Sequence, residues 1–102
     1  GDMRGIVIDP GAKPELYRLP DTLQELQRFM GGYAQRCPIS NRFAALFYLP
    51  QAGQSLPTRH YKGRWFYGRL CIVGWHKTSM SDLRKPLAEE LLQKFEPVEV
   101  TL

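Results

Sequence analysis

Short apolar runs near the start of the chain have the two-residue repeat and β-branched side chains that are typical of strands. Residues 3–8 contain Ile6, Val7 and Ile8 and are followed by Asp9-Pro10-Gly11, which favours a turn. Residues 15–19 alternate apolar and charged side chains. We therefore predict two strands, joined by a loop, before Pro20.

The segment after Pro20 has the repeat of an amphipathic helix. Asp21 is expected to cap its start, with Gln24 in the position of a capping box, and the Gly31-Gly32 pair is expected to end it. The apolar residues that share one helix face are Leu23, Leu26, Phe29 and Met30.

The middle of the chain is rich in strand-forming residues that are separated by turn sequences. The predicted extended segments are 33–39, 42–49, 65–67 and 69–75. Pro38 limits its segment to a sheet edge or end, 42–49 is expected to be central, and Gly68 suggests a bulge. After the turn at 50–53, the residues up to Gly63 have no clear periodicity, and we predict a long exposed loop of the kind that often carries binding groups.

A second apolar repeat predicts a helix near the C-terminus. Its apolar positions are Leu83, Leu87, Leu91 and Phe95. Residues 79–82 resemble a helix start, and Pro86 fits best as the first full helical position after a separate turn, because an interior proline would remove a backbone hydrogen bond. Pro97 is expected to end the helix, and 98–102 alternate as a final strand.

These segments together predict an α+β fold. We expect a single small domain over residues 1–102, with a mixed or mostly antiparallel sheet of five to six short strands. The two amphipathic helices are expected to pack on one face of that sheet. A doubly wound sheet is disfavoured because it needs a helix after most strands.

Composition is typical of a folded globular protein, with 43% apolar and 24% charged residues in 102. The chain has no apolar run near the roughly 20 residues of a membrane span and no pattern of a signal peptide. Gly1 has the character of an expression-tag remnant. Cys37 and Cys71 are too few for a disulfide framework, so we expect free thiols and a cytoplasmic location.

The charges divide the chain into an acid-free middle and two acidic ends. All ten acidic residues lie at or before Glu25 or at or after Asp82, whereas eight of the 14 basic residues lie between them. The middle is therefore +8 and the flanks −4, which gives the net charge of +4. This distribution favours an anionic partner.

Cations and aromatic rings alternate closely in the second half of this basic segment. Its candidate nucleic-acid-binding residues are Arg59, His60, Tyr61, Lys62, Arg64, Trp65 and Arg69. In this hypothesis the cations contact phosphates, and Tyr61 or Trp65 stacks on a base. The alternative is structural: strand alternation places Trp65 and Tyr67 on one side and Arg64 and Phe66 on the other, so that the aromatic rings form core and the arginines a solvated face.

Other chemistries have little support in the sequence. The ligands that a soft metal prefers are His60, His76, Cys37 and Cys71, and none of them are paired at the short spacings of local metal sites. The serines lie in turn-like contexts outside any nucleophile elbow, and Cys71 lies in an apolar strand that disfavours a thiolate. We therefore predict no catalytic residue, no metal and no cofactor.

Several turn and cap sequences together resemble DUF3846, an uncharacterised family of bacteria, phages and mobile elements. The matching features are Ile8-Asp9-Pro10-Gly11, Pro14-Glu15, Asp21-Thr22-Leu23, Leu26-Gln27, Gly31-Gly32-Tyr33, Leu56-Pro57-Thr58-Arg59, Tyr67-Gly68, Ile72-Val73-Gly74 and Ser79-Met80-Ser81-Asp82. The resemblance covers nearly the whole chain and implies a compact domain, but it carries no known activity. The chain departs from the family at 50–53, where such proteins often have an acidic turn.

The sequence thus favours a non-catalytic binding or accessory module of bacterial or mobile-element origin. One alternative is a nucleic-acid-binding protein that uses the basic and aromatic surface. Another is a protein-interaction module that forms a homodimer through an exposed edge strand near Pro38 or through the final strand. An enzyme is the third alternative.

Overall fold

The computed structural model describes residues 1–52 and 57–97, which form eight strands, two α-helices and one short 3-10 turn. The strands are β1 (Asp2–Ile8), β2 (Glu15–Pro20), β3 (Gln35–Ile39), β4 (Ala44–Tyr48), β5 (Pro57–Tyr61), β6 (Arg64–Tyr67), β7 (Leu70–His76) and β8 (Ser79–Ser81). The helices are α1 (Leu23–Met30) and α2 (Lys85–Lys94), and the turn is η1 (Ser40–Arg42). The α+β prediction is confirmed.

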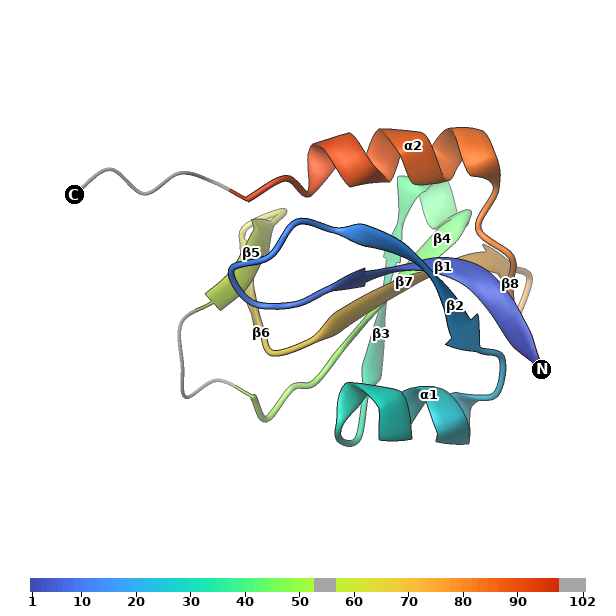
Figure 1. Ribbon diagram of the computed structural model, residues 1–102, viewed down its shortest axis with the longest axis horizontal. Helices are drawn as coiled ribbons and strands as arrows, with labels where there is room; N and C mark the ends of the chain where they lie inside the picture. Colours follow the sequence, from blue (N-terminus) through green and yellow to red (C-terminus); the bar gives the residue numbers. More distant parts are fainter. Residues whose placement is uncertain (53–56, 98–102) are drawn as a thin grey trace.

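Six strands form the main sheet, in which every pairing is antiparallel. The order is β2-β1-β7-β4-β3, and β8 pairs with the far end of β7. The strand β3, which contains Pro38, lies at an edge, and β4 lies inside the sheet, as predicted. The hairpin of β5 and β6 is a separate two-stranded sheet at one end of the molecule (Figure 1).

The two helices cover opposite faces of the main sheet, so the prediction that both pack on one face was wrong (Figure 1). Ile6 and Ile8 belong to the core under α2, whereas Val7, between them, belongs to the core under α1. Successive strand residues point to opposite faces, so an unbroken apolar run needs cover on both sides. The run from Leu70 to Val73 is fully buried, so β7 is also covered on both faces.

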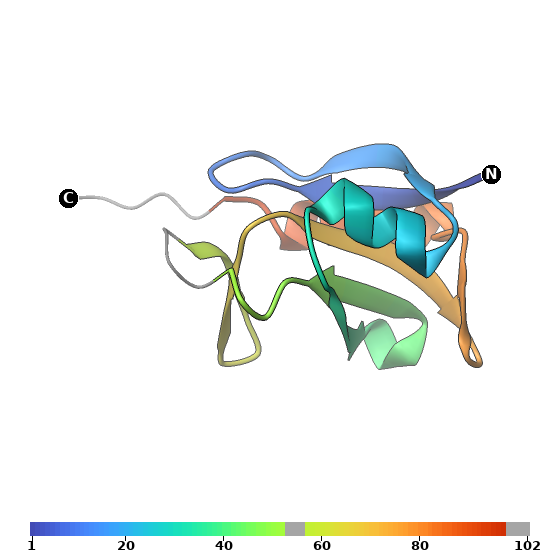
Figure 2. The same ribbon diagram turned by 90° about the horizontal axis from the view of Figure 1, so that it is seen from below.

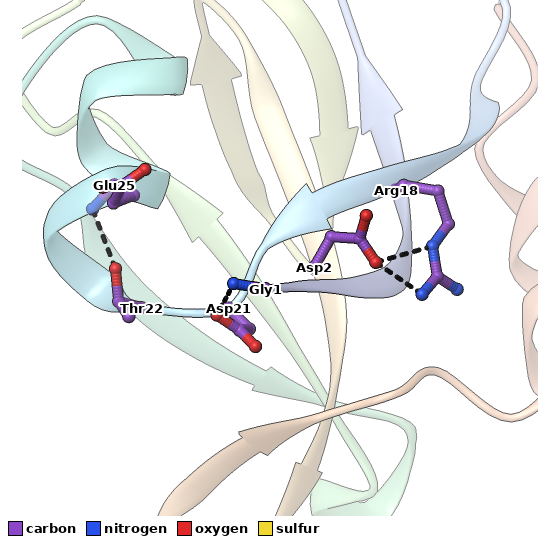
Figure 3. Close-up of polar contacts among 6 residues, drawn as sticks. All are labelled: Gly1, Asp2, Arg18, Asp21, Thr22 and Glu25. Atoms are coloured by element: carbon purple, nitrogen blue, oxygen red, sulfur yellow. Dashed lines mark hydrogen bonds and ion pairs between the residues drawn. The ribbon is translucent and has the colours of Figure 1, made fainter.

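The helix α1 begins and ends with capping groups. Its N-cap is Thr22, whose hydroxyl oxygen accepts a hydrogen bond from the Glu25 backbone N–H at 3.3 Å, so the prediction of Asp21 as the cap was wrong (Figure 3). Asp21 instead lies 3.6 Å from the N-terminal amine. Gly31 ends the helix at φ 97°, a left-handed conformation that glycine adopts without strain, which confirms the predicted stop.

Two segments near the middle and end of the chain differ from their predictions. Part of the expected loop before Gly63 is the strand β5, in which Thr58, Arg59 and Tyr61 are buried. The expected helix start at 79–82 is the strand β8, and the Asp82 carboxylate accepts a hydrogen bond from the Arg4 backbone N–H at 2.7 Å. The predicted strand at 98–102 lies outside the described residues.

Candidate ligand-binding surface

The eight cations of the acid-free segment lie on several elements and do not form one face. Arg28 belongs to α1, Arg36 to β3 and Arg42 to η1. Lys62 lies in the turn of the β5–β6 hairpin, whereas Lys77 lies in the turn between β7 and β8, at the opposite end of the molecule (Figure 1). The polyanion hypothesis therefore depends on a local cluster and not on the segment as a whole.

Arg59, a predicted phosphate contact, is only 6% exposed, which rules out that role in this conformation. Its guanidinium donates hydrogen bonds to the backbone carbonyls of Phe95 at 2.7 Å, of Thr58 at 2.6 Å and of Ala12. Burial lowers the pKa of Arg59, and nearby Glu96 partly opposes that effect. The side chain joins the hairpin to the end of α2 and to the loop after β1.

Arg69 is also engaged within the protein. Its guanidinium forms two hydrogen bonds to the Asp9 carboxylate, at 2.7 and 3.2 Å, and lies over the Phe29 ring at 4.5 Å from the ring centre. The hydrogen bond to Asp9 raises the pKa of Arg69, mainly by stabilising its charged form. A carboxylate from the acidic N-terminal flank thus compensates this cation.

The outer face of the β5–β6 hairpin carries two exposed rings. His60 and Trp65 are directly opposite each other in the strand pair, and their ring centres are 4.5 Å apart. Trp65 is 59% exposed, while the neighbouring Phe66 is buried. The predicted alternation of Trp65 and Phe66 is confirmed, but Trp65 is a surface residue and not core.

Three cations surround the aromatic residues on the inner side of this hairpin. Lys62 and Lys94 lie 5.4 and 5.0 Å from the centre of the buried Tyr61 ring. The Arg64 guanidinium lies 4.8 Å from the Tyr48 ring centre, and Arg64 is opposite Tyr61 in the strand pair. Among the described residues these three cations have no carboxylate within 4.0 Å. We call Lys62, Arg64 and Lys94 the cationic rim.

Lys94 was not predicted from the sequence as a site residue, because it is 30 residues beyond Arg64 and belongs to another element. Only the packing of α2 against Tyr61 brings it to the hairpin. Its position, a cation in the last turn of α2, is explained equally well by the helix dipole. The sequence therefore contained no signal that Lys94 takes part in binding.

A groove of about 480 Å³ lies between η1 and α2. Phe43, Leu87 and Leu91 supply its apolar surface, and Lys94 of the cationic rim also lines it. Phe43 is 67% exposed and directly follows the turn Ser40–Arg42. In Figure 2, η1 and the hairpin lie on the β3–β4 side of the sheet.

The residues considered for metal binding or catalysis do not converge. His60 lies in the hairpin and His76 at the far end of β7, near β8. Burial raises the pKa of Cys71 to about 12, so its thiol is protonated at neutral pH. In the part of the chain that the structure describes, no three His, Cys, Asp or Glu side chains are grouped to hold a metal ion.

The chain matches no protein-family model, no curated protein and no solved structure. Neither helix of the described residues is long and apolar enough to cross a membrane. The function therefore has to be inferred from the surface described above.

Proposed function

We propose that this chain is a non-catalytic binding module and that its ligand is single-stranded nucleic acid. The binding surface consists of the outer face of the β5–β6 hairpin, with His60 and Trp65, and of the cationic rim. The observation that carries the proposal is a hairpin with an exposed Trp65 ring on its outer face and, on its inner side, cations that have no carboxylate partner among the described residues.

Each part of this surface has a role in such a complex. An exposed indole provides a flat face on which a base stacks, and His60 packs against that indole with 4.5 Å between ring centres and 50° between ring planes. The cationic rim supplies charge for the phosphates. Stacking needs unpaired bases, so the surface favours a single strand over a duplex.

The main test is the affinity of a fluorescent oligothymidylate, measured by anisotropy. Because stacking contributes about 1–3 kcal/mol per base, Trp65→Ala should weaken binding by about 5- to 100-fold. Tyr33→Ala is the matched control, since Tyr33 is 77% exposed but lies between α1 and β3. Equal affinity of the wild type and Trp65→Ala would contradict the proposal.

Self-association is a second candidate function, because β3 is an edge strand of the main sheet. In that case two copies would meet along β3, and Pro38 would limit the hydrogen bonds that they form. Analytical ultracentrifugation distinguishes the two functions: a dimer that Trp65→Ala leaves unchanged and that Pro38→Ala strengthens, because the substitution restores a backbone N–H at the edge, would favour self-association.

We also propose that the chain belongs to the DUF3846-like proteins of bacteria and mobile elements and acts in the cytoplasm. The resemblance is supported by glycines of its turn sequences, because Gly11, Gly31 and Gly68 have φ values of 74°, 97° and 73°. Glycine is favoured at such positions. The free thiols of Cys37 and Cys71 agree with a reducing compartment.

A further inference from the structure

We propose that the groove between η1 and α2 extends the hairpin surface and that Phe43 is a second stacking platform for the same strand of nucleic acid. This inference rests on the proposed function and deepens it. The ligand would run beside α2 from Phe43 to the cationic rim on the inner side of the hairpin, and would reach Trp65 on the outer face around the turn that holds Lys62.

Lys94 connects the two parts of this surface. Its ammonium group lies 5.0 Å from the Tyr61 ring centre in the hairpin core, and the same residue lines the groove. Arg84, at the other end of α2, also lines the groove. The ten-residue separation of Arg84 and Lys94 corresponds to about 15 Å along a helix. A ligand that contacts both cations therefore has to be extended.

The charge of the groove suits a polyanion. Arg84 and Lys94 lie among its lining residues, and Glu90 is the single acid among those that the structure describes. Arg42, in the adjoining turn, is exposed and has no carboxylate within 4.0 Å among the described residues. The apolar surface of Phe43, Leu87 and Leu91 lies between these cations and provides a place for a base.

The backbone of η1 supports a role for Phe43. Ser40, Asn41 and Arg42 have φ values of 53°, 54° and 70°, three consecutive left-handed residues without a glycine. Such residues are strained, and strain of this kind concentrates at functional sites. The turn is followed by Phe43, whose backbone is fixed by hydrogen bonds to Ser40 and Trp75, both at 3.0 Å, while its ring stays exposed. The fold thus keeps the Phe43 ring exposed to solvent next to the groove.

The experiment compares two oligothymidylates, one of about 12 and one of about 4 nucleotides, which bracket the shorter single-strand site sizes. Phe43→Ala should weaken binding of the longer oligomer by about 5- to 50-fold and leave the shorter one nearly unchanged. Trp65→Ala should weaken both. Phe43→Trp should retain the affinity for the longer oligomer and show more tryptophan quenching than the wild type, in which Trp65 alone stacks, a result that a purely structural role of Phe43 does not predict.

The outcomes separate the two proposals. If Trp65→Ala weakens binding and Phe43→Ala does not, the extended site is wrong and the hairpin surface stands. If neither oligomer binds the wild type, both proposals fail. Competition by polyglutamate as strong as by the longer oligomer would show that the surface recognises charge alone, and this would overturn the role of Phe43.

Discussion

Arg59 and Trp65 lie on opposite sides of one hairpin, and their environments give them opposite roles. Arg59 is buried with three backbone carbonyls around its guanidinium, whereas Trp65 is exposed beside His60. In the sequence both belong to the same run of alternating cations and aromatics. The bulge between Pro57 and Arg59 in the strand pairing sets which of these residues face inward.

Arg59→Met should destabilise the fold by about 3 kcal/mol, because it leaves buried carbonyls without donors. Chemical denaturation followed by circular dichroism measures this change. Arg64→Met is the control: Arg64 is exposed, and its removal should cost less than about 1 kcal/mol. Equal destabilisation by the two variants would show that the carbonyl contacts of Arg59 contribute little.

At the scale of elements, close backbone packing fixes the path between β7 and α2. Gly74 pairs with Ser81 of β8, and a Cβ atom there would lie 2.3 Å from the Asp82 carbonyl oxygen. The next residue, Leu83, donates its backbone N–H to the Arg4 carbonyl at 2.9 Å. These contacts explain why 79–82 form a strand and a crossing to β1 instead of the predicted helix start.

Gly74→Ala should therefore destabilise the protein by about 2 to 4 kcal/mol, since the backbone of Asp82 has to move. Gly32→Ala is the matched control, because the nearest atom to its added Cβ is a Leu49 methyl at 3.6 Å. We expect a change within about 0.5 kcal/mol there. Thermal unfolding of both variants tests the prediction, which fails if Gly74→Ala unfolds at the wild-type temperature.

At the scale of the whole molecule, the charges of the basic segment are dispersed and only part of them lie near the proposed ligand. The cationic rim combines two residues of that segment with Lys94 from the acidic C-terminal flank. Arg69 is compensated by Asp9, and Lys77 lies at the far end. Net charge therefore says less about binding than the local arrangement does.

This arrangement predicts a moderate salt dependence. Contacts from the rim and Arg84 to four phosphates correspond to a slope of about −3 in a plot of log affinity against log salt concentration. Arg64→Gln should reduce the magnitude of that slope by about 0.7, and Lys77→Gln should leave it unchanged. Anisotropy titrations at several salt concentrations measure both. If Arg64→Gln and Lys77→Gln changed the slope equally, the salt dependence would come from the overall positive charge and not from a local binding site.

The sequence by itself determined the local elements, because apolar periodicity, turn glycines and prolines act over a few residues. It predicted the α+β class, the helix that ends at Gly31, the edge position of Pro38 and the alternation of Trp65 and Phe66. The tertiary structure alone decided how these parts meet. It placed the helices on opposite faces, buried Arg59, paired Arg69 with Asp9 and brought Lys94 to the hairpin. Such contacts join residues far apart in the chain, so no local pattern of side chains specifies them.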